Sequence, residues 1–199
     1  MAEYTISFEE KKHKKKFEYS DITDTLDSFH ERDFSTNDIF QITLWKIDRY
    51  PFVNDDTLKK LNSLRTKISL DEEKTKDVLM NLLNTNGVGL PMASTYLRFL
   101  NPNVYQIIDV RAYRAAFYYE PEHSYVYVKK EHQITVYIEY LKQLQKIAKD
   151  GYLGAKVDFK DLDRFLYDVD KISGYSLNET PIFDKDKLVD SICKLMKLN

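Results

Sequence analysis

A glycine-rich connection in the middle of the chain has the residue types of an anion-binding turn. Asn86 and Gly87 suit the left-handed conformation that ends a helix, and Pro91 suits the first turn of the next one. The backbone amides of Gly87, Val88 and Gly89 are then expected to point outward at a helix N-terminus, where they can bind a phosphate. On these residues alone, a tight helix–helix connection is the simpler interpretation. A dinucleotide site is not indicated, because a preceding strand and a third glycine are missing.

Asp109 stands at the junction between an apolar segment, residues 104–108, and the start of a new helix. Aspartate is a preferred residue at a helix N-terminus, where its side chain accepts a hydrogen bond from a backbone amide. A carboxylate in such a position can also stabilise developing positive charge or deprotonate a water molecule. The residue type alone favours the capping role, and the two roles are compatible.

Three central features follow one another in the order and spacing of a known family. They are Gly87-Val-Gly89, the small residue Ala93, and Ile107-Ile-Asp-Val-Arg111. Together they resemble the helix-hairpin-helix superfamily of base-excision DNA glycosylases, which have a hairpin rich in Gly and Pro followed by a catalytic aspartate. The close match covers residues 80–118. It implies a two-lobed, all-helical fold and duplex DNA as the partner.

The resemblance implies that Asp109 is the catalytic carboxylate of a reaction that hydrolyses the bond between base and sugar. Positive charge builds on the sugar in such a reaction, and a nearby carboxylate stabilises it. The target nucleotide has to be turned out of the duplex, while the hairpin amides hold phosphates without reading sequence. Arg111 and Arg114 are expected to add phosphate contacts, although a surface salt bridge explains them nearly as well.

Two departures from the family restrict the expected activity. Lyase-competent members carry a lysine shortly after the hairpin glycines, whereas this chain has Pro91 there and no lysine between Lys76 and Lys129. The cysteine cluster of a family iron–sulfur centre is also missing, since Cys193 is the single cysteine. The sequence therefore predicts a monofunctional DNA glycosylase of base excision repair, without lyase activity.

Two other functions stay open at this point. The first is a non-catalytic helix-hairpin-helix module that binds DNA and has lost the glycosylase activity, which Pro91 and the near-neutral charge favour. The second is a helical interaction protein in which the hairpin is only a tight turn. The damaged base, if there is one, is not identified by the sequence.

A few further side chains are weaker candidates for the site. Trp45 and Tyr118 are candidates for a base pocket, although packing explains a tryptophan and most of the 15 tyrosines more simply. Asp161 and Asp163 indicate a solvated helix start, where acidic residues favour the helix dipole.

The hydrophobic periodicity predicts helices that position these residues. Five Gly and five Pro leave long stretches free to be helical, which favours an all-α fold. The helix from Ser35 is expected to begin with a capping box to Asp38 and to be buried on much of its circumference. The expected helices span residues 21–31, 35–48, 55–67, 71–84, the second hairpin helix, 131–150, 157–171 and 184–198, and 124–128 is expected to be extended.

These elements suggest a basic N-terminal tail over residues 1–19 and a single helical unit over 20–199. Within that unit, residues 54–117 form a hairpin lobe, and residues 20–53 with 120–199 form a second lobe. Asp109 is expected at the mouth of the cleft between the lobes.

The composition fits a soluble, cytoplasmic protein. Of 199 residues, 43% are hydrophobic and 31% charged, which is the balance of a folded protein, and the net charge of −2 counts mildly against a nucleic-acid binder. A single cysteine and four histidines without metal-ligand spacing predict no disulfide, no metal and no cofactor. No apolar run reaches the roughly 20 residues that span a bilayer, and no secretion signal is seen, so no membrane contact is expected. The sequence gives no protein partner.

Overall fold

Helices are the secondary structure of the regions that the structure describes. The computed structural model describes residues 25–26, 28–46, 51–119, 129–176 and 183–197, which contain eight α-helices, two 3-10 helices and no strand. The all-α class expected from the sequence is therefore confirmed. The chain divides into two compact units, Met1–Tyr50 and Pro51–Asn199, and each is described by itself.

The first unit contains the 3-10 helix η1 (Ser28–Glu31) and the helix α3 (Thr36–Lys46). The expected capping box is present, because the Ser35 amide donates to Asp38 Oδ2 at 2.7 Å and the Asp38 amide donates to Ser35 Oγ at 3.3 Å. Arg32 also donates to Asp38 at 2.6 Å. These hydrogen bonds, from Arg32 first, hold the pKa of the Asp38 carboxyl well below its ordinary range.

Four of the five apolar residues of α3 are exposed and Ile42 is half-buried, so the burial expected for much of this helix is wrong. Phe40 is 61% exposed, Leu44 41% and Trp45 37%. Of the side chains described in this unit, only those of Phe29 and Asp38 are buried. A unit this small supplies too few neighbours to cover two apolar stripes of one helix.

The second unit begins with α4 (Asp55–Asn62) and α5 (Glu72–Leu83), which start within one residue of the expected positions. The α4 helix ends earlier than the expected residue 67, and turns follow it as far as residue 66. The buried Asn101 side chain explains this early end, because its Nδ2 donates to the backbone carbonyls of Leu64 at 3.1 Å and Lys67 at 2.8 Å.

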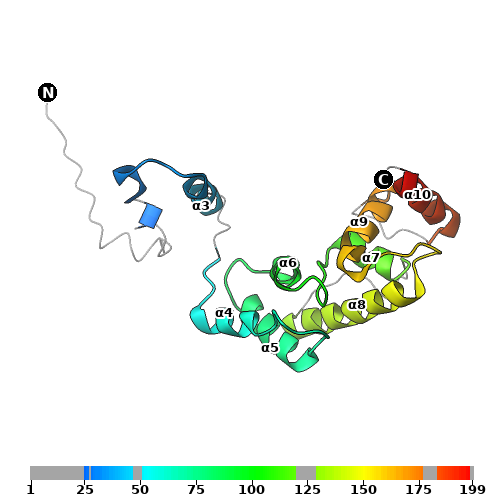
Figure 1. Cartoon of the computed structure of the whole chain (residues 1–199), viewed down its shortest axis with the longest axis horizontal. Coiled ribbons are helices and arrows are strands. Elements are labelled where there is room, and N and C mark those ends of the chain that lie inside the picture. The colour runs from blue at the N-terminus through cyan, green and yellow to red at the C-terminus, as the bar shows by residue number, and fades with distance from the viewer. Residues whose placement is uncertain (1–24, 27, 47–50, 120–128, 177–182, 198–199) are drawn as a thin grey trace, which may run out of the picture. The chain divides into compact units, whose positions relative to one another are not determined.

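The remaining helices of the second unit include α8, the longest helix described. Both α5 and α7 pack against α8, and α9 lies between α7 and α10 (Figure 1). These helices are α6 (Leu90–Leu100), α7 (Val110–Ala116), α8 (Lys130–Asp150), the 3-10 helix η3 (Phe159–Asp161), α9 (Leu162–Ile172) and α10 (Lys185–Lys197).

Fully buried tyrosines connect these helices to the segments between them. The Tyr137 hydroxyl donates to the Gln106 carbonyl at 2.9 Å, and the Tyr152 hydroxyl donates to the Ala115 carbonyl at 2.9 Å. Because each buried hydroxyl has a partner, these side chains bury their rings without leaving a polar group unsatisfied. The packing role expected for most tyrosines is confirmed for these two.

Some expectations fall outside the described residues. The basic tail, residues 1–19, and the extended segment, residues 124–128, are among them. The division into lobes over residues 54–117 and over 20–53 with 120–199 stays a prediction.

Candidate functional site

The hairpin between α5 and α6 has the backbone conformation that its glycines predict. Gly87 has a φ of +79°, which favours glycine, and Gly89 is the N-cap of α6. No side chain caps α6, and its second residue, Pro91, has no amide hydrogen to satisfy. Within the described part of the chain, the amides of Gly87 and Gly89 form no hydrogen bond.

Val88 differs from its glycine neighbours. Its amide donates to the Thr85 carbonyl at 3.2 Å, and its side chain is buried. The expectation that this amide points outward is therefore wrong, since the turn itself uses it. The predicted phosphate contact of Val88 has a competing partner inside the chain, and the Gly87 and Gly89 amides are the better candidates.

Gly89 leaves open space that the fold itself does not use. Its backbone, with φ −92° and ψ 173°, is extended and open to any residue. A Cβ atom at this position would meet nothing closer than Pro91 Cδ at 3.9 Å. The fold itself therefore does not require glycine at this position.

Asp109 is the N-cap of α7 and is half-buried. One of its carboxylate oxygens, Oδ1, accepts a hydrogen bond from the Ala112 amide at 2.8 Å, so the capping role weighed from the sequence is present. Burial raises the pKa of the Asp109 carboxyl above its ordinary value, and the negative charges of Asp170 and Asp163 raise it further. The amides of Ala112 and Arg111 offset only part of this shift.

The segment that leads into Asp109 is held by side chains from several helices. On one side, the Ile107 amide donates to Asp163 Oδ2 at 3.1 Å, and the Tyr140 hydroxyl donates to the Ile107 carbonyl at 3.0 Å. The Ile108 amide donates to Ser94 Oγ at 3.2 Å. Because α6, α8 and α9 all contribute partners, this non-helical backbone has its polar groups satisfied and its position fixed.

Ser94 connects this segment to the hairpin. The serine is completely buried in α6, and its hydroxyl donates to the Pro91 carbonyl at 2.8 Å while accepting from the Ile108 amide. The first turn of the second hairpin helix is thus one side chain away from the residue before Asp109. A ligand held by the hairpin would keep a fixed relation to the Asp109 carboxylate.

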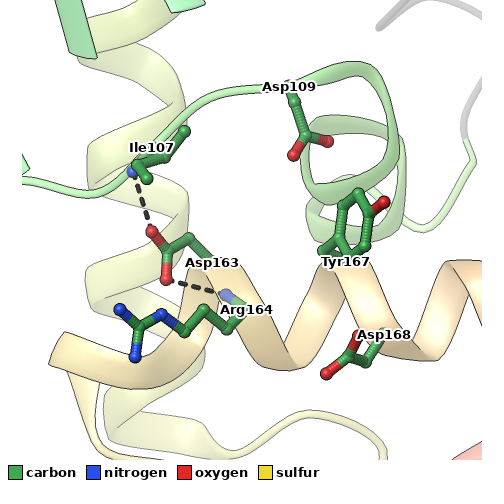
Figure 2. Close-up of a pocket in the computed structure, with 6 residues that line it drawn as sticks. All are labelled: Ile107, Asp109, Asp163, Arg164, Tyr167 and Asp168. Carbon is green, nitrogen blue, oxygen red and sulfur yellow. Dashed lines mark hydrogen bonds between the residues drawn. The ribbon is translucent and has the colours of Figure 1, made fainter. Parts of the chain in front are cut away.

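A pocket of about 230 Å³ lies beside Asp109. Figure 2 shows Asp109 on the α7 side and a row of side chains from α9 opposite it. The lining residues are Ile107, Asp109, Asp163, Arg164, Tyr167 and Asp168.

Asp163 is buried, so the solvated position expected for it is wrong. It is only 3% exposed, and besides Ile107 it accepts a hydrogen bond from the Arg164 amide at 2.7 Å. The Arg98 guanidinium Nε lies 3.9 Å from Asp163 Oδ2, which places a compensating charge next to it. A buried charge is tolerated here because amides and a cation surround it.

Arg111 and Arg114 both reach the fully buried Asp170 on α9. Arg111 donates to Asp170 Oδ1 and Arg114 donates to Asp170 Oδ2, each at 2.6 Å. Both guanidinium groups also donate to the Tyr175 carbonyl. These contacts favour the ion-pair alternative, in a buried rather than a surface form, and the phosphate role of both arginines stays a prediction.

The two candidates for a base pocket are not among the residues that line this one. Tyr118 stacks on the Tyr152 ring, with centroids 5.2 Å apart and an interplanar angle of 9°. Trp45 belongs to the first unit. The aromatic residue that lines the pocket is Tyr167, which the sequence did not single out.

Sequence reasoning missed Ser94 and Tyr167 as site residues, and it predicted a solvated helix start at Asp163 rather than a buried contact of the site. Each lies on a helix face whose pattern fits packing or solvent exposure equally well. The one available signal is the helical spacing of Asp163, Arg164, Tyr167 and Asp168, which places them on adjoining positions of one helix surface.

No metal site or membrane-spanning helix accompanies this pocket in the regions described. Among those residues, no group of three or more His, Cys, Asp or Glu side chains is placed to hold a metal ion. No helix there has the length and apolar character needed to cross a membrane. Comparisons of the chain with models of protein families, with curated protein sequences and with solved structures found no match.

Proposed function

We propose that this protein binds duplex DNA and hydrolyses the N-glycosidic bond of a damaged or mispaired base, with Asp109 as the catalytic carboxylate. The observation that carries the proposal is the connection from hairpin to carboxylate. Through Ser94, the second hairpin helix holds the segment that presents Asp109 at the edge of a pocket. The resemblance of the central segment to helix-hairpin-helix DNA glycosylases supports the same function.

The hairpin would hold the DNA backbone without reading its sequence. The Gly87 and Gly89 amides have no partner among the described residues, and the open space at Gly89 lets a phosphate approach closely. The nucleotide to be cleaved is turned out of the stack, because its glycosidic bond is inaccessible inside a duplex. The two-lobed glycosylase architecture, with the base between the lobes, is part of this proposal.

In the proposed reaction, the C1′–N bond breaks and its electron pair leaves with the base. Positive charge develops on the sugar, and the Asp109 carboxylate stabilises it. The oxygen of a water molecule forms the new bond to C1′, and the carboxylate accepts a proton from that water. The proton then passes to the departing base, so an abasic site and a free base are the products.

A lyase step is not part of the proposal, because it requires an amine that forms a Schiff base. The residues lining the pocket include no lysine, and Pro91 occupies the position of the family's lyase lysine. The expected product is therefore an abasic site in an intact strand.

A second candidate function is a DNA-binding module without catalysis. The observation that favours it is the hydrogen bond from the Ala112 amide to Asp109, which gives the carboxylate a structural role that needs no chemistry. In this case the hairpin still binds DNA, and no base is released.

The experiment that tests the function is a glycosylase assay on duplexes carrying oxidised, alkylated, deaminated and mismatched bases. Strand breaks that form only after alkali treatment are expected, with a rate at least about 100-fold lower in Asp109→Asn. The exposed α10 residue Asp186, changed to Asn, is the matched control and keeps the wild-type rate. Release of a base by Asp109→Asn at the wild-type rate would contradict the catalytic assignment, and DNA binding without any release would support the second candidate.

A further inference from the structure

The wall of the pocket opposite Asp109 is one face of α9. Asp163, Arg164, Tyr167 and Asp168 are at positions that a helix brings onto adjoining parts of its surface. All four line the pocket, but Figure 2 shows that only the Tyr167 ring stands between α9 and Asp109, whereas the Arg164 side chain extends away from α7 and the Asp168 carboxylate lies lower on α9. The function proposed above gives a role to Asp109 and leaves the α9 wall without one.

The side chains on this wall differ in whether they already have hydrogen-bond partners within the protein. Asp163 is buried and accepts from the amides of Ile107 and Arg164, so its oxygens serve the fold. The side chains of Arg164 and Asp168 are exposed and form no hydrogen bond or ion pair with any residue that the structure describes. They are therefore free to meet a ligand.

Tyr167, which lies between Arg164 and Asp168 in the sequence, supplies an aromatic ring to the same wall. It is half-buried, and the Lys171 ammonium lies 5.7 Å from its ring centroid. A cation near one part of the ring holds the side chain in place and leaves it able to stack on a planar group. At about 230 Å³, the pocket is smaller than the roughly 300–1,000 Å³ typical of pockets for drug-sized ligands, which suits a single base.

The chemistry of the free groups restricts which base fits. The Asp168 carboxylate, when ionised, only accepts hydrogen bonds. A base edge that meets it has to donate. Adenine, cytosine and guanine derivatives carry an exocyclic amino group with two N–H donors, whereas a carbonyl at the same position places an acceptor against a carboxylate.

We infer that Tyr167 and Asp168 select the base, and that the selected base carries an exocyclic amino group. Tyr167 stacks on the base, Asp168 accepts from its amino group, and Arg164 contacts a phosphate of the same strand. This inference rests on the proposed function, because it concerns the substrate of the same pocket. It separates damaged amino-bearing bases, which are substrates, from deaminated bases, which are not.

Matched probe duplexes test this inference. In each pair, the damaged base of one duplex carries an exocyclic amino group and that of the other does not. We would compare duplexes with 5-hydroxycytosine and 5-hydroxyuracil, and with 8-oxoguanine and 8-oxohypoxanthine. The wild-type protein is expected to release the amino-bearing member of a pair at least roughly tenfold faster. In Asp168→Asn this preference falls toward equality, because an amide both donates and accepts. Asp186→Asn keeps the wild-type preference.

Equal rates for both members of each pair in the wild-type protein would overturn the inference. So would a preference that Asp168→Asn leaves unchanged. Since Asp168 is exposed and has no described partner, this variant is expected to unfold at the same temperature as the wild type. If the unfolding transition of Asp168→Asn is shifted, Tyr167→Ala is the second variant to test, and it is expected to slow the release of all amino-bearing bases.

Binding measurements keep the inference testable if no base is released at all. Fluorescence anisotropy with the same duplexes, in Asp109→Asn so that no turnover interferes, would report base preference alone. Tighter binding of amino-bearing probes that disappears on adding the Asp168→Asn change would support base selection while the glycosylase proposal fails. Equal binding of both members of each pair would overturn the inference independently of catalysis.

Discussion

Asp109 accepts a hydrogen bond from the Ala112 amide at 2.8 Å, while burial raises the pKa of its carboxyl. Asparagine and aspartate are about equally good at a helix N-cap. A position that served only as a cap would therefore not require the charged side chain, and the ionised form is the one that burial disfavours. The proposed catalytic role of Asp109 would account for a charged side chain at this position.

The first prediction concerns the stability of Asp109→Asn. Because the pKa of Asp109 is higher in the folded state than in the unfolded chain, ionisation of this group destabilises the fold above that pKa. Asparagine keeps the cap and removes the charge, so the variant is expected to be more stable than the wild type at pH 7. The difference narrows as the pH falls through the raised pKa, where Asp109 becomes protonated in the wild type.

Urea unfolding of both proteins at neutral pH and at about pH 4 measures this difference. Asp109→Ala is the control for the cap, and it is expected to lose about 1 kcal/mol relative to Asp109→Asn. A less stable Asp109→Asn at pH 7, or a gap that widens on acidification, would show that the charge contributes to folding rather than to function.

The residue scale also shows where a sequence pattern stops being informative. An arginine in the first turns of a helix after a DNA-binding hairpin suits a phosphate contact, yet Arg111 and Arg114 donate to the buried Asp170. Asp170 lies 56 residues beyond Arg114 in the chain. A partner so distant in sequence becomes visible only when α7 and α9 are packed together.

At the scale of elements, the decisive arrangement is the contact between α6 and the segment before Asp109. Two neighbouring hydroxyls on α6, those of Ser94 and Thr95, both donate to the Pro91 carbonyl at 2.8 Å. Only Ser94 also accepts from the Ile108 amide. Ser94 and Thr95 are therefore a matched pair. Both form the local contact within α6, and only Ser94 also connects α6 to the segment before Asp109.

The second prediction is that Ser94→Ala lowers the rate of base release more than it lowers DNA affinity. Removing the hydroxyl leaves the buried Ile108 amide without an acceptor, which costs about 1–3 kcal/mol of stability and lets the segment before Asp109 shift. Single-turnover release and anisotropy measure the two effects separately.

Thr95→Ala is the control and is expected to keep both the rate and the affinity. Equal losses in the two alanine variants would contradict the connection, and so would a DNA affinity that falls as far as the rate in Ser94→Ala. Ser94→Thr, which keeps the hydroxyl, is expected to recover part of the rate.

The sequence predicts element types well and element environments poorly. The capping box at Ser35, the positive φ at Gly87 and the N-cap at Asp109 depend on neighbouring residues, and all of them are present. The exposure of α3 and the burial of Asp163 depend on which helices pack together. Local patterns are the same in both environments, so neither could be predicted from spacing alone.

At the scale of the whole molecule, the net charge of −2 gives no general attraction to DNA. The hairpin contains no lysine, and the phosphate contacts proposed for it come from backbone amides. The fold does place a cation next to it, because Lys130 donates to the Asn84 side chain at 2.5 Å. Binding is therefore expected to depend on close approach of the backbone as well as on charge.

The third prediction is that Gly89→Ala weakens binding to duplexes of every sequence at a small cost in stability, about 0.5 kcal/mol, because alanine is a poorer N-cap residue than glycine. The new methyl group comes no closer to the protein than Pro91 Cδ at 3.9 Å, an ordinary contact, but it occupies the space through which a phosphate would approach. Anisotropy at several salt concentrations is the measurement, and wild-type affinity is expected to fall as salt rises.

Gly87→Ala is the contrasting variant at the same turn. Its φ of +79° is unfavourable for alanine, so this change is expected to cost about 1 kcal/mol of stability. Wild-type DNA affinity in Gly89→Ala would contradict a phosphate contact at the hairpin.

The side chains that hold the segment before Asp109 have a consequence for hydrogen exchange. The Ile107 and Ile108 amide protons are donated to Asp163 and Ser94, on two different helices, so deuterium reaches them only when those helices separate. Their exchange is expected to follow global unfolding, although the segment is not helical. The Gly87 and Gly89 amides, which have no described acceptor, exchange quickly from the native state. The two ends of the site are therefore expected to differ in protection from exchange. The amides near Asp109 exchange only when the whole unit unfolds, and the hairpin amides exchange directly with solvent.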